Sequence, residues 1–191
     1  MIKKEIITIA GRPGSGKSST AKAVAAALGF EHFSSGDLFR AISKENGIDV
    51  LQANLSAEAN ADIDRQVDGR LQEIYASQEQ LVLDSRTAWH WMPGSFKVFL
   101  DLDLHTAAER ILEDTDDARL ASEHVQRDPD EYAALLQRRL ESESRRYKAL
   151  YGIDPYVMSN YDLVIATAAN NLEQVCQKVL AGYQQKMSQK S

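Results

Sequence analysis

Short runs of β-branched and other apolar residues alternate along the chain with longer stretches of helical spacing. The apolar runs predict five strands, over residues 6–10, 31–33, 81–83, 97–100 and 163–166. The spacing of apolar positions between and after them predicts helices over residues 17–28, 106–112, 130–150 and 172–187. This alternation favours an α/β fold with a mostly parallel sheet, and a chain of 191 residues has the length of one domain.

Two segments exceed this minimal alternation. Residues 41–79 predict helices joined by a turn at Gly47, inside an insertion that we place at about 36–79. Residues from about 113 to 130 are acidic and poorly periodic. The first follows the second strand and the second follows the helix after the fourth strand, and we expect both above the carboxyl edge of the sheet, where open α/β folds bind ligands. The first would hold a substrate, and the second would form a short lid.

A glycine-rich segment links the first strand to the first helix. It matches the pattern G-x-x-x-x-G-K-[ST], and the residues that we expect to bind ATP are Gly11, Arg12, Pro13, Gly14, Ser15, Gly16, Lys17, Ser18 and Ser19. Glycines let main-chain N–H groups approach phosphate oxygens, and the helix that follows directs its positive end at them. Lys17 would reach the β- and γ-phosphates, and Ser18 would ligate Mg²⁺.

A phosphate loop does not by itself separate a switch GTPase, an ATPase and a small-molecule kinase. The fourth strand is followed by Leu100-Asp101-Leu102-Asp103 and not by the Asn-Lys-x-Asp that reads guanine, which argues against a switch GTPase. The net charge of −6 gives no general attraction to nucleic acid or to an anionic membrane. Small-molecule nucleotides are therefore the expected partners of a chain that we take to be monomeric.

The redox and targeting signals are sparse. The single cysteine, Cys176, cannot form an internal disulfide, and the first residues show no signal-peptide pattern. No apolar stretch approaches the ~18 residues of a membrane span. A cytoplasmic protein is expected.

A second phosphate-binding motif follows the second strand. In Ser34-Ser35-Gly36-Asp37-Leu38-Phe39-Arg40, a capping turn starts a helix that carries Arg40, and an arginine there can grip a phosphate in bidentate fashion. The block resembles the Ser-x-Gly-Asp-x-x-Arg segment of nucleoside monophosphate kinases, in which the arginine holds the acceptor's phosphate. The alternative is a capped surface helix with an exposed arginine.

Further segments narrow the resemblance. In chain order they are Val82-Leu83-Asp84-Ser85-Arg86, Lys97-Val98-Phe99-Leu100-Asp101, Ala108-Glu109-Arg110-Ile111, the stretch from Arg145 to Asp154, and Tyr161-Asp162-Leu163-Val164-Ile165-Ala166-Thr167. Together they resemble the short cytidylate kinases common in archaea, over nearly the whole chain. The resemblance implies a three-layer P-loop kinase fold with five parallel strands in the order 2-3-1-4-5. It also implies phosphorylation of CMP or dCMP with ATP and Mg²⁺.

Several side chains are expected on the metal and acceptor side. Asp84 ends the third strand, where a carboxylate can hold Mg²⁺ together with Ser18. The expected acceptor-binding residues are Ser35, Gly36, Asp37, Arg40, Asp68, Arg70 and Arg86, with a structural ion pair as the alternative for Arg86. Of these, Ser35, Asp68 and Arg70 could read the cytosine edge, although a charged amphipathic helix around Asp68 could equally be a solvated face.

Phosphoryl transfer needs positive charge around the transferring group. By the family resemblance, the expected catalytic residues besides Lys17 are Arg110, Arg139, Arg145 and Arg146. The sequence departs from the family at Asp114, where a basic residue is usual. Either Arg119 or Arg127 substitutes, or the acceptor differs from CMP, or the enzyme is slow.

Two other functions stay open on the sequence alone. One is a P-loop kinase of another small acceptor, and the other is a nucleotide-binding regulatory module with little turnover. The aromatic stretch over residues 88–96 could wall an acceptor base or simply cap the sheet edge.

Overall fold

The structure is a computed structural model that describes residues 5–47, 57–115 and 127–189. Its strands are β1 (Glu5–Gly11), β2 (Glu31–Ser34), β3 (Gln80–Asp84), β4 (Phe96–Asp101) and β5 (Leu163–Ala166). They form one sheet in the order β2-β3-β1-β4-β5, and every neighbouring pair is parallel. The α/β class and the strand order expected from the sequence are confirmed.

The helices also lie close to their expected positions. They are α1 (Lys17–Leu28), α2 (Ser35–Glu45), α4 (Ala57–Ser77), α5 (Ala88–Trp91), α6 (Leu104–Asp114), α8 (Pro129–Tyr151), the 3₁₀ turn η1 (Met158–Asn160) and α9 (Leu172–Gln189). The insertion between β2 and β3 is helical, as expected, with α2 ending before Gly47. The middle of the expected lid, including Arg119, lies outside the described residues.

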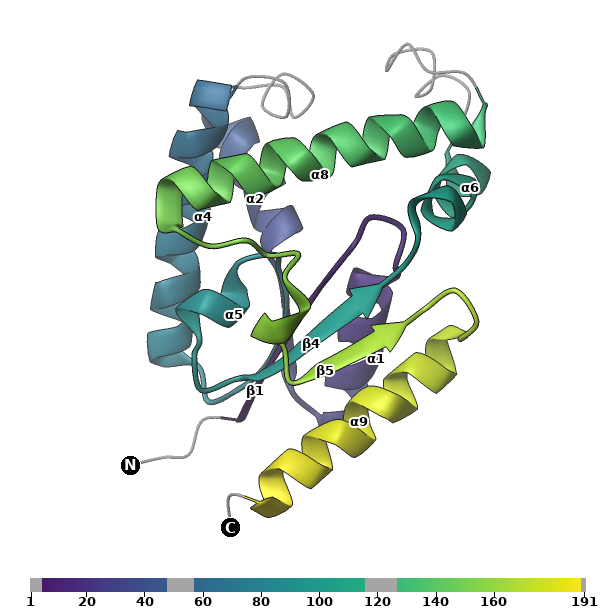
Figure 1. The fold of residues 1–191 in the computed structure, drawn as a ribbon. Helices are drawn as coiled ribbons and strands as arrows, with labels where there is room; N and C mark the ends of the chain where they lie inside the picture. Colours follow the sequence, from purple (N-terminus) through teal and green to yellow (C-terminus); the bar gives the residue numbers. More distant parts are fainter. Residues whose placement is uncertain (1–4, 48–56, 116–126, 190–191) are drawn as a thin grey trace.

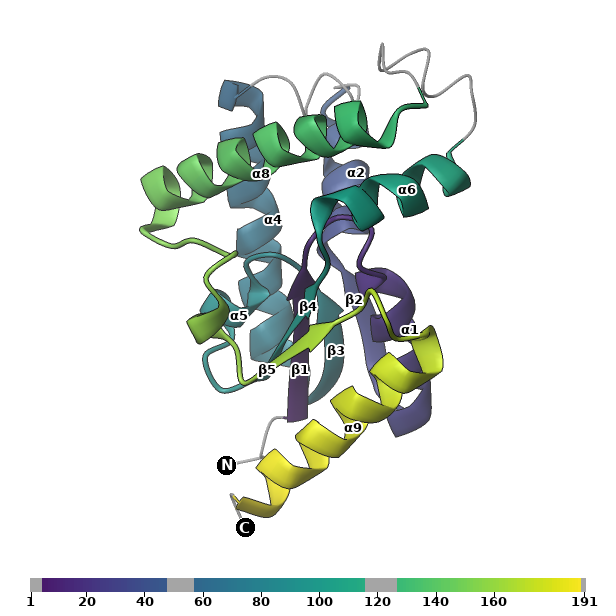
Figure 2. The ribbon, with the colours of Figure 1, turned by 45° about the vertical axis from the view of Figure 1, so that its right-hand side comes forward.

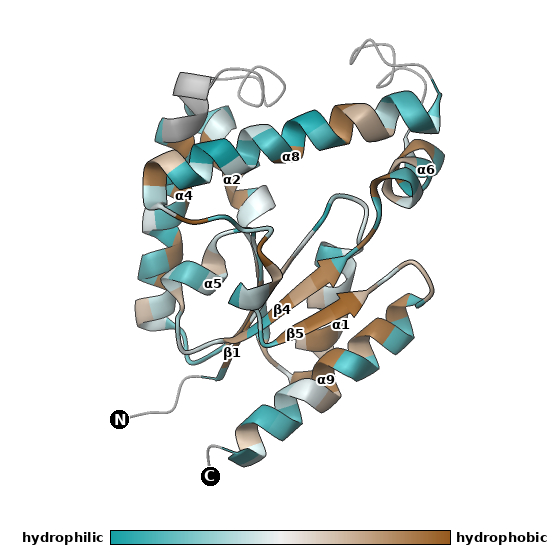
Figure 3. Cartoon of the chain, in the orientation of Figure 1, coloured by the Kyte–Doolittle hydropathy of each residue, from teal (hydrophilic) through white to brown (hydrophobic). Residues whose placement is uncertain are grey.

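Three layers follow from the period-two alternation of the strands. Ile7 and Ile9 of β1 face one side, where they pack with Val24 of α1 and Val179 of α9. Ile6 faces the other side, where the core contains apolar residues of α4 and α5. The brown strands and the mixed surfaces of the helices in Figure 3 show this arrangement. Helices therefore cover both faces, as a buried parallel sheet requires.

The carboxyl ends of the strands lie together at one edge of the sheet. In the ladder, Asp84 pairs with Ile9 on one side and with Ser34 on the other, while Gly11 pairs with Leu100. The segments that follow β1, β2, β3 and β4 therefore emerge together. Helix α8 crosses over this edge and packs against α6 and α4 (Figures 1 and 2).

None of the described helices is both long and apolar enough to cross a bilayer.

Candidate active site

The loop after β1 has the backbone that its glycines make possible. Gly14 and Gly16 have φ values of +67° and +80°, which L side chains rarely adopt. A Cβ on Gly11 would lie 2.3 Å from the Leu100 carbonyl oxygen. Gly16 caps the N-terminus of α1, so the loop presents the positive end of a 12-residue helix.

Lys17 is held inside this loop. Its Nζ donates to the Arg12 carbonyl oxygen at 2.8 Å, and the Ser15 hydroxyl donates to the same oxygen at 2.7 Å. Burial, helped by the positive charge of Arg86, lowers the pKa of Lys17 to about 7. An anionic phosphate would reverse this effect, since it favours the charged ammonium. Ser18 and Ser19 are exposed in the first turn of the helix.

Asp84 offers an oxygen ligand beside this loop. The residue is 5% exposed, and its Oδ2 is buried without a hydrogen-bond partner. The Nε2 of His32 lies 3.4 Å from that oxygen. A lone carboxylate and the Ser18 hydroxyl fit Mg²⁺, which binds few protein groups and takes most other ligands from water and phosphate. Within the described residues no group of three or more His, Cys, Asp or Glu could hold a metal, so a dedicated protein cage is not part of this arrangement.

A half-buried charge network joins the segment after β3 to α8. The Nε of Arg86 lies 2.8 Å from Oε2 of Glu143, and the Tyr156 hydroxyl donates to the same oxygen. Glu143 raises the pKa of Arg86 above its usual range. Although burial opposes ionisation of Glu143, Arg86 and Tyr156 lower the pKa of that carboxyl. The network keeps Arg86 charged and fixed next to the phosphate loop.

Sequence reasoning did not identify Glu143 or Tyr156 as site residues. Glu143 lies four residues after Arg139 and three before Arg146, which places it on the helix face of those two expected catalytic arginines. That spacing was a usable signal. No such signal in the sequence indicates Tyr156, because its approach to Glu143 depends on the path of the chain after α8.

A second ion pair connects α8 to the insertion. Arg146 donates through Nε to Oδ2 of Asp64 at 2.6 Å, and the two side chains are 20% and 8% exposed. Burial raises the pKa of Asp64, and Arg146 offsets part of that effect. This contact ties the expected catalytic Arg146 to α4.

Asp68 lies one turn further along α4, at a junction with α5 and the end of α8. Thr87 donates to its Oδ1 at 2.9 Å, and the rings of Trp91 and Tyr151 stand 5.2 Å apart nearby. Asp68 Oδ2, Trp91 Nε1 and the Tyr151 hydroxyl are buried together, and the Trp91 and Tyr151 donors offset part of the effect of burial on the pKa of Asp68. Burial raises the pKa of Asp68. A solvated face is therefore the wrong interpretation for Asp64 and Asp68.

The two tryptophans of the aromatic stretch have different surroundings. Trp89 is 8% exposed and packs with Phe99 and Tyr161, which covers the edge of the sheet. Trp91 instead lies at the Asp68 junction. Capping of the sheet edge therefore describes Trp89, and a wall for an acceptor base stays a prediction for Trp91.

The motif after β2 starts α2. The Ser34 hydroxyl accepts from the Asp37 backbone N–H at 3.4 Å, which caps the helix that begins at Ser35. Arg40 forms an ion pair with Asp37, both side chains are more than half exposed, and its guanidinium packs against Gly36. The turn brings Ser34, Gly36, Asp37 and Arg40 together and leaves the Arg40 guanidinium accessible to a ligand.

Arg70 does not join the other expected acceptor residues. It lies on the exposed face of α4, where it pairs with Glu73 at 2.6 Å. Residues two positions apart on a helix point in nearly opposite directions, so burial of Asp68 turns Arg70 toward solvent. We therefore leave Arg70 out of the site.

The remaining arginines differ in what they bind. Arg110 donates to the carbonyl oxygens of Thr167 and Ala168, at 3.0 and 3.2 Å, just after β5. Arg127 donates to the carbonyl oxygens of Leu112 and Thr115 and so caps α6. Arg139 and Arg145 are exposed on α8.

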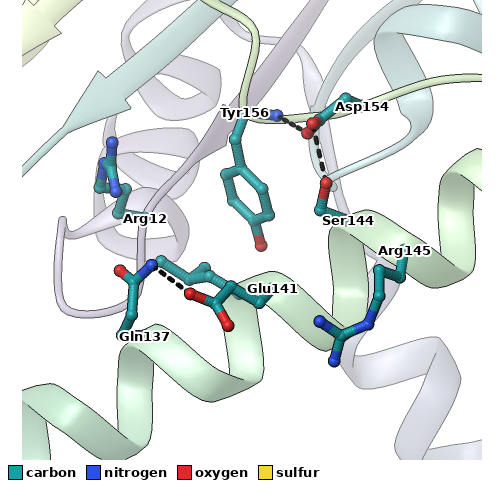
Figure 4. Close-up of a pocket in the computed structure, with 8 residues that line it drawn as sticks. Arg12, Gln137, Glu141, Ser144, Arg145, Asp154 and Tyr156 are labelled. Carbon is teal, nitrogen blue, oxygen red and sulfur yellow. Dashed lines mark hydrogen bonds between the residues drawn. The ribbon is translucent and has the colours of Figure 1, made fainter.

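A cleft of about 310 Å³ opens between the phosphate loop and α8. Figure 4 shows the residues around it, with the Tyr156 ring between Arg12 and Arg145. Its walls come from the loop, from α8 and from the segment after α8; the lining residues are Arg12, Gln137, Leu140, Glu141, Ser144, Arg145, Asp154 and Tyr156.

Solved structures with the same fold include two small-molecule kinases. The shikimate kinase from Acinetobacter baumannii, in complex with shikimate, superposes with a TM-score of 0.63 at 18% identity, covering 99% of this chain and 96% of that chain. A gluconokinase from Sinorhizobium meliloti gives 0.59 at 22% identity, with 97% and 94% covered. At these identities the likeness shows the fold alone.

The sequence comparisons define the family. Residues 6–169 match the cytidylate kinase-like family. A cytidylate kinase of Haloarcula marismortui is 40% identical over 167 residues, covering 85% of this chain and 81% of the relative. That of Methanobrevibacter smithii is 32% identical over 175 residues, covering 92% and 96%. The chain belongs to the cytidylate kinase-like family, which confirms the resemblance and the enzyme class, a nucleoside monophosphate kinase, predicted from the sequence.

Proposed function

We propose that this protein transfers the γ-phosphoryl group of ATP to CMP or dCMP. The observation that carries the proposal is the proximity of two cationic groups from different motifs, Lys17 of the phosphate loop and Arg86 after β3. The pairing of Ile9 with Asp84, and the hydrogen bond from the Ser85 N–H to the Ile9 carbonyl oxygen at 3.0 Å, set the segment that carries Arg86 beside the loop that carries Lys17. A donor phosphate on the loop and an acceptor phosphate on Arg86 would thus meet at one edge of the sheet.

The reaction needs little covalent chemistry from the protein. A phosphate oxygen of the acceptor forms a bond to the γ-phosphorus, and the bond from that phosphorus to the β,γ-bridging oxygen breaks, which leaves its electron pair on ADP. The acceptor phosphate is mostly a dianion at neutral pH, so no general base has to remove a proton. Lys17 and Arg146 supply positive charge to the transferring group.

The proposed donor residues are those of the loop from Gly11 to Ser19. For the acceptor we propose the α2 turn for the phosphate, with Ser35, Gly36, Asp37 and Arg40, together with Arg86. Asp68 is proposed to accept a hydrogen bond from the cytosine amino group. The burial of Asp68 supports this role, because a buried carboxylate gains from a hydrogen-bond donor.

Arg110, Arg139 and Arg145 remain proposed lid arginines. Arg139 and Arg145 have the exposure that a ligand requires, while Arg110 now lies against the segment after β5. Ser18 and Asp84 would hold Mg²⁺, which when bound would neutralise charge on the ATP phosphates. A monomeric, cytoplasmic enzyme completes the proposal, consistent with a single buried free cysteine.

A coupled assay for ADP formation tests the function. ATP is held constant while CMP, dCMP, UMP, AMP, GMP, shikimate and gluconate are compared. We expect CMP and dCMP to give the highest kcat/KM. Absence of ADP formation with every monophosphate would refute the proposal, and a preference for a hydroxylated metabolite would replace it with another small-molecule kinase.

The variant Arg40→Ala refines the test. It should raise the KM for CMP at least tenfold if Arg40 grips the acceptor phosphate, because a charge-assisted bidentate contact is worth about 1.5–3 kcal/mol. Thermal shift with CMP and a non-hydrolysable ATP analogue gives a second readout, since a true acceptor stabilises the folded protein. A regulatory module would bind ATP without forming ADP.

A further inference from the structure

Arg12 is the second residue of the phosphate loop, and both polar groups of its backbone form hydrogen bonds. Its N–H donates to the Leu100 carbonyl oxygen at 3.1 Å, and its own carbonyl oxygen accepts from Lys17 and Ser15. Because Lys17 is the group that reaches the β- and γ-phosphates, the Arg12 side chain starts directly beside the place where those phosphates bind.

The side chain of Arg12 is also fixed, but only at one nitrogen. Its Nε donates to Oδ1 of Asp101 at 2.8 Å. Within residues 5–47, 57–115 and 127–189, no other hydrogen bond or ion pair of this guanidinium is found, so its two terminal amino groups are available. The side chain lines the cleft under α8 and is 28% exposed. The terminal groups can therefore meet an anion that occupies the cleft.

The backbone of Asp101 is itself fixed by hydrogen bonds. It ends β4, and its carbonyl oxygen accepts from the Thr167 backbone N–H at 2.8 Å and from the Thr167 hydroxyl at 3.1 Å. Arg110 in turn donates to the Thr167 carbonyl oxygen. A chain of contacts thus runs from the phosphate loop through the ends of β4 and β5. An ion pair as exposed as that of Arg12 and Asp101 adds little to stability, so orientation is the effect it can deliver.

The expected lid is acidic at its start, and the two arginines described beside it bind main-chain oxygens. The sequence from Glu113 to Asp117 is acidic apart from Thr115. Arg110 and Arg127 both donate to main-chain carbonyl oxygens. A transferring phosphoryl group nevertheless needs cationic N–H donors around its equatorial oxygens.

We propose that Arg12 is a catalytic residue that donates to the transferring γ-phosphoryl group through its terminal amino groups, with Asp101 as the positioning residue that orients it. This inference rests on the proposed phosphoryl transfer and deepens it. Arg12 takes no part in bond making or breaking; it stabilises negative charge on the phosphoryl oxygens as the bond to the bridging oxygen breaks.

The test uses the full chain with Arg12→Met, Arg12→Lys and Asp101→Asn. Arg65→Met is the matched control, because Arg65 forms an exposed 2.7 Å pair with Asp62 away from the loop. We expect Arg12→Met to lower kcat by ~100- to 1,000-fold with a change of less than about threefold in the KM for ATP, as for loss of a donor to a transition state. Arg12→Lys and Asp101→Asn should each lose about tenfold, and Arg65→Met should match the wild type.

A binding measurement separates this inference from the function on which it rests. ADP with aluminium fluoride mimics the transferring phosphoryl group, and its affinity is compared with that of ADP alone, with no acceptor present. Arg12→Met should weaken ADP–aluminium fluoride by at least about thirtyfold and ADP by less than about threefold. Equal losses for the two ligands, or a kcat within threefold of Arg65→Met, would overturn the proposal.

Two other results also have a defined interpretation. If the wild type forms no ADP with any acceptor, the proposed function fails, and the aluminium fluoride comparison still decides the role of Arg12. If circular dichroism shows that Arg12→Met does not fold, Arg12→Lys decides: full activity overturns the proposal, and a loss of kcat with unchanged affinity for ADP supports it.

Discussion

The ion pair between Asp64 and Arg146 allows a quantitative test of how α4 is fastened to α8. Replacing Asp64 by Ala removes a carboxylate oxygen 2.6 Å from Nε of Arg146 and leaves a guanidinium that is only 20% exposed. Removing one partner of a buried pair costs about 3–5 kcal/mol, and the partial exposure of Arg146 favours the lower end, about 3 kcal/mol. For a domain of this size, that loss corresponds to a decrease in Tm of roughly 6–12 °C.

The same helix provides the control. Asp62 pairs with Arg65 at 2.7 Å, but the two side chains are 74% and 61% exposed, so Asp62→Ala should cost at most about 1 kcal/mol. Urea unfolding of both variants, of Arg146→Met and of the double variant Asp64→Ala/Arg146→Met completes a double-mutant cycle. If Asp64→Ala and Asp62→Ala lower the free energy of unfolding equally, the conclusion that burial strengthens the Asp64–Arg146 pair is refuted.

Two further predictions concern stability. Burial raises the pKa of Asp68 above its ordinary value of 3.8, so its stabilising contribution is complete below pH 3.8 and is lost as the pH rises through the folded-state pKa. Because Asn does not ionise, the free energy of unfolding of the wild type minus that of Asp68→Asn should fall as the pH rises from about 4; a pH-independent difference would contradict this. Gly11→Ala should cost about 3 kcal/mol or more in chemical unfolding, because its Cβ would lie 2.3 Å from the Leu100 carbonyl oxygen. Gly69→Ala on α4, where a Cβ meets nothing within 4 Å, should instead stabilise the protein by about 0.5–1 kcal/mol.

The sequence predicted well those features that are encoded locally. The phosphate loop and the strand before it follow from adjacent residues, and the strand order came with the family resemblance. Contacts between side chains that are far apart in the sequence were not predictable in this way. Asp64 and Arg146 are 82 positions apart, and their contact depends on where α8 crosses the insertion.

Arg70 illustrates a different limit. It was grouped with Asp68 because a carboxylate and an arginine could together read the cytosine edge, yet α4 is a helix and its period separates them. Applying that period strictly would have kept Asp68 and rejected Arg70. The burial of Asp68 itself needed the structure, because it is produced by Thr87, Trp91 and Tyr151 from two other helical segments.

The 23 residues of α8 make a rod roughly 35 Å long. One end packs on α6 and the other carries the residues that hold α4 and Arg86. A rod of this kind transmits displacement along its length, since bending it would break main-chain hydrogen bonds. A displacement of α4 along the axis of α8 would therefore be passed to α6.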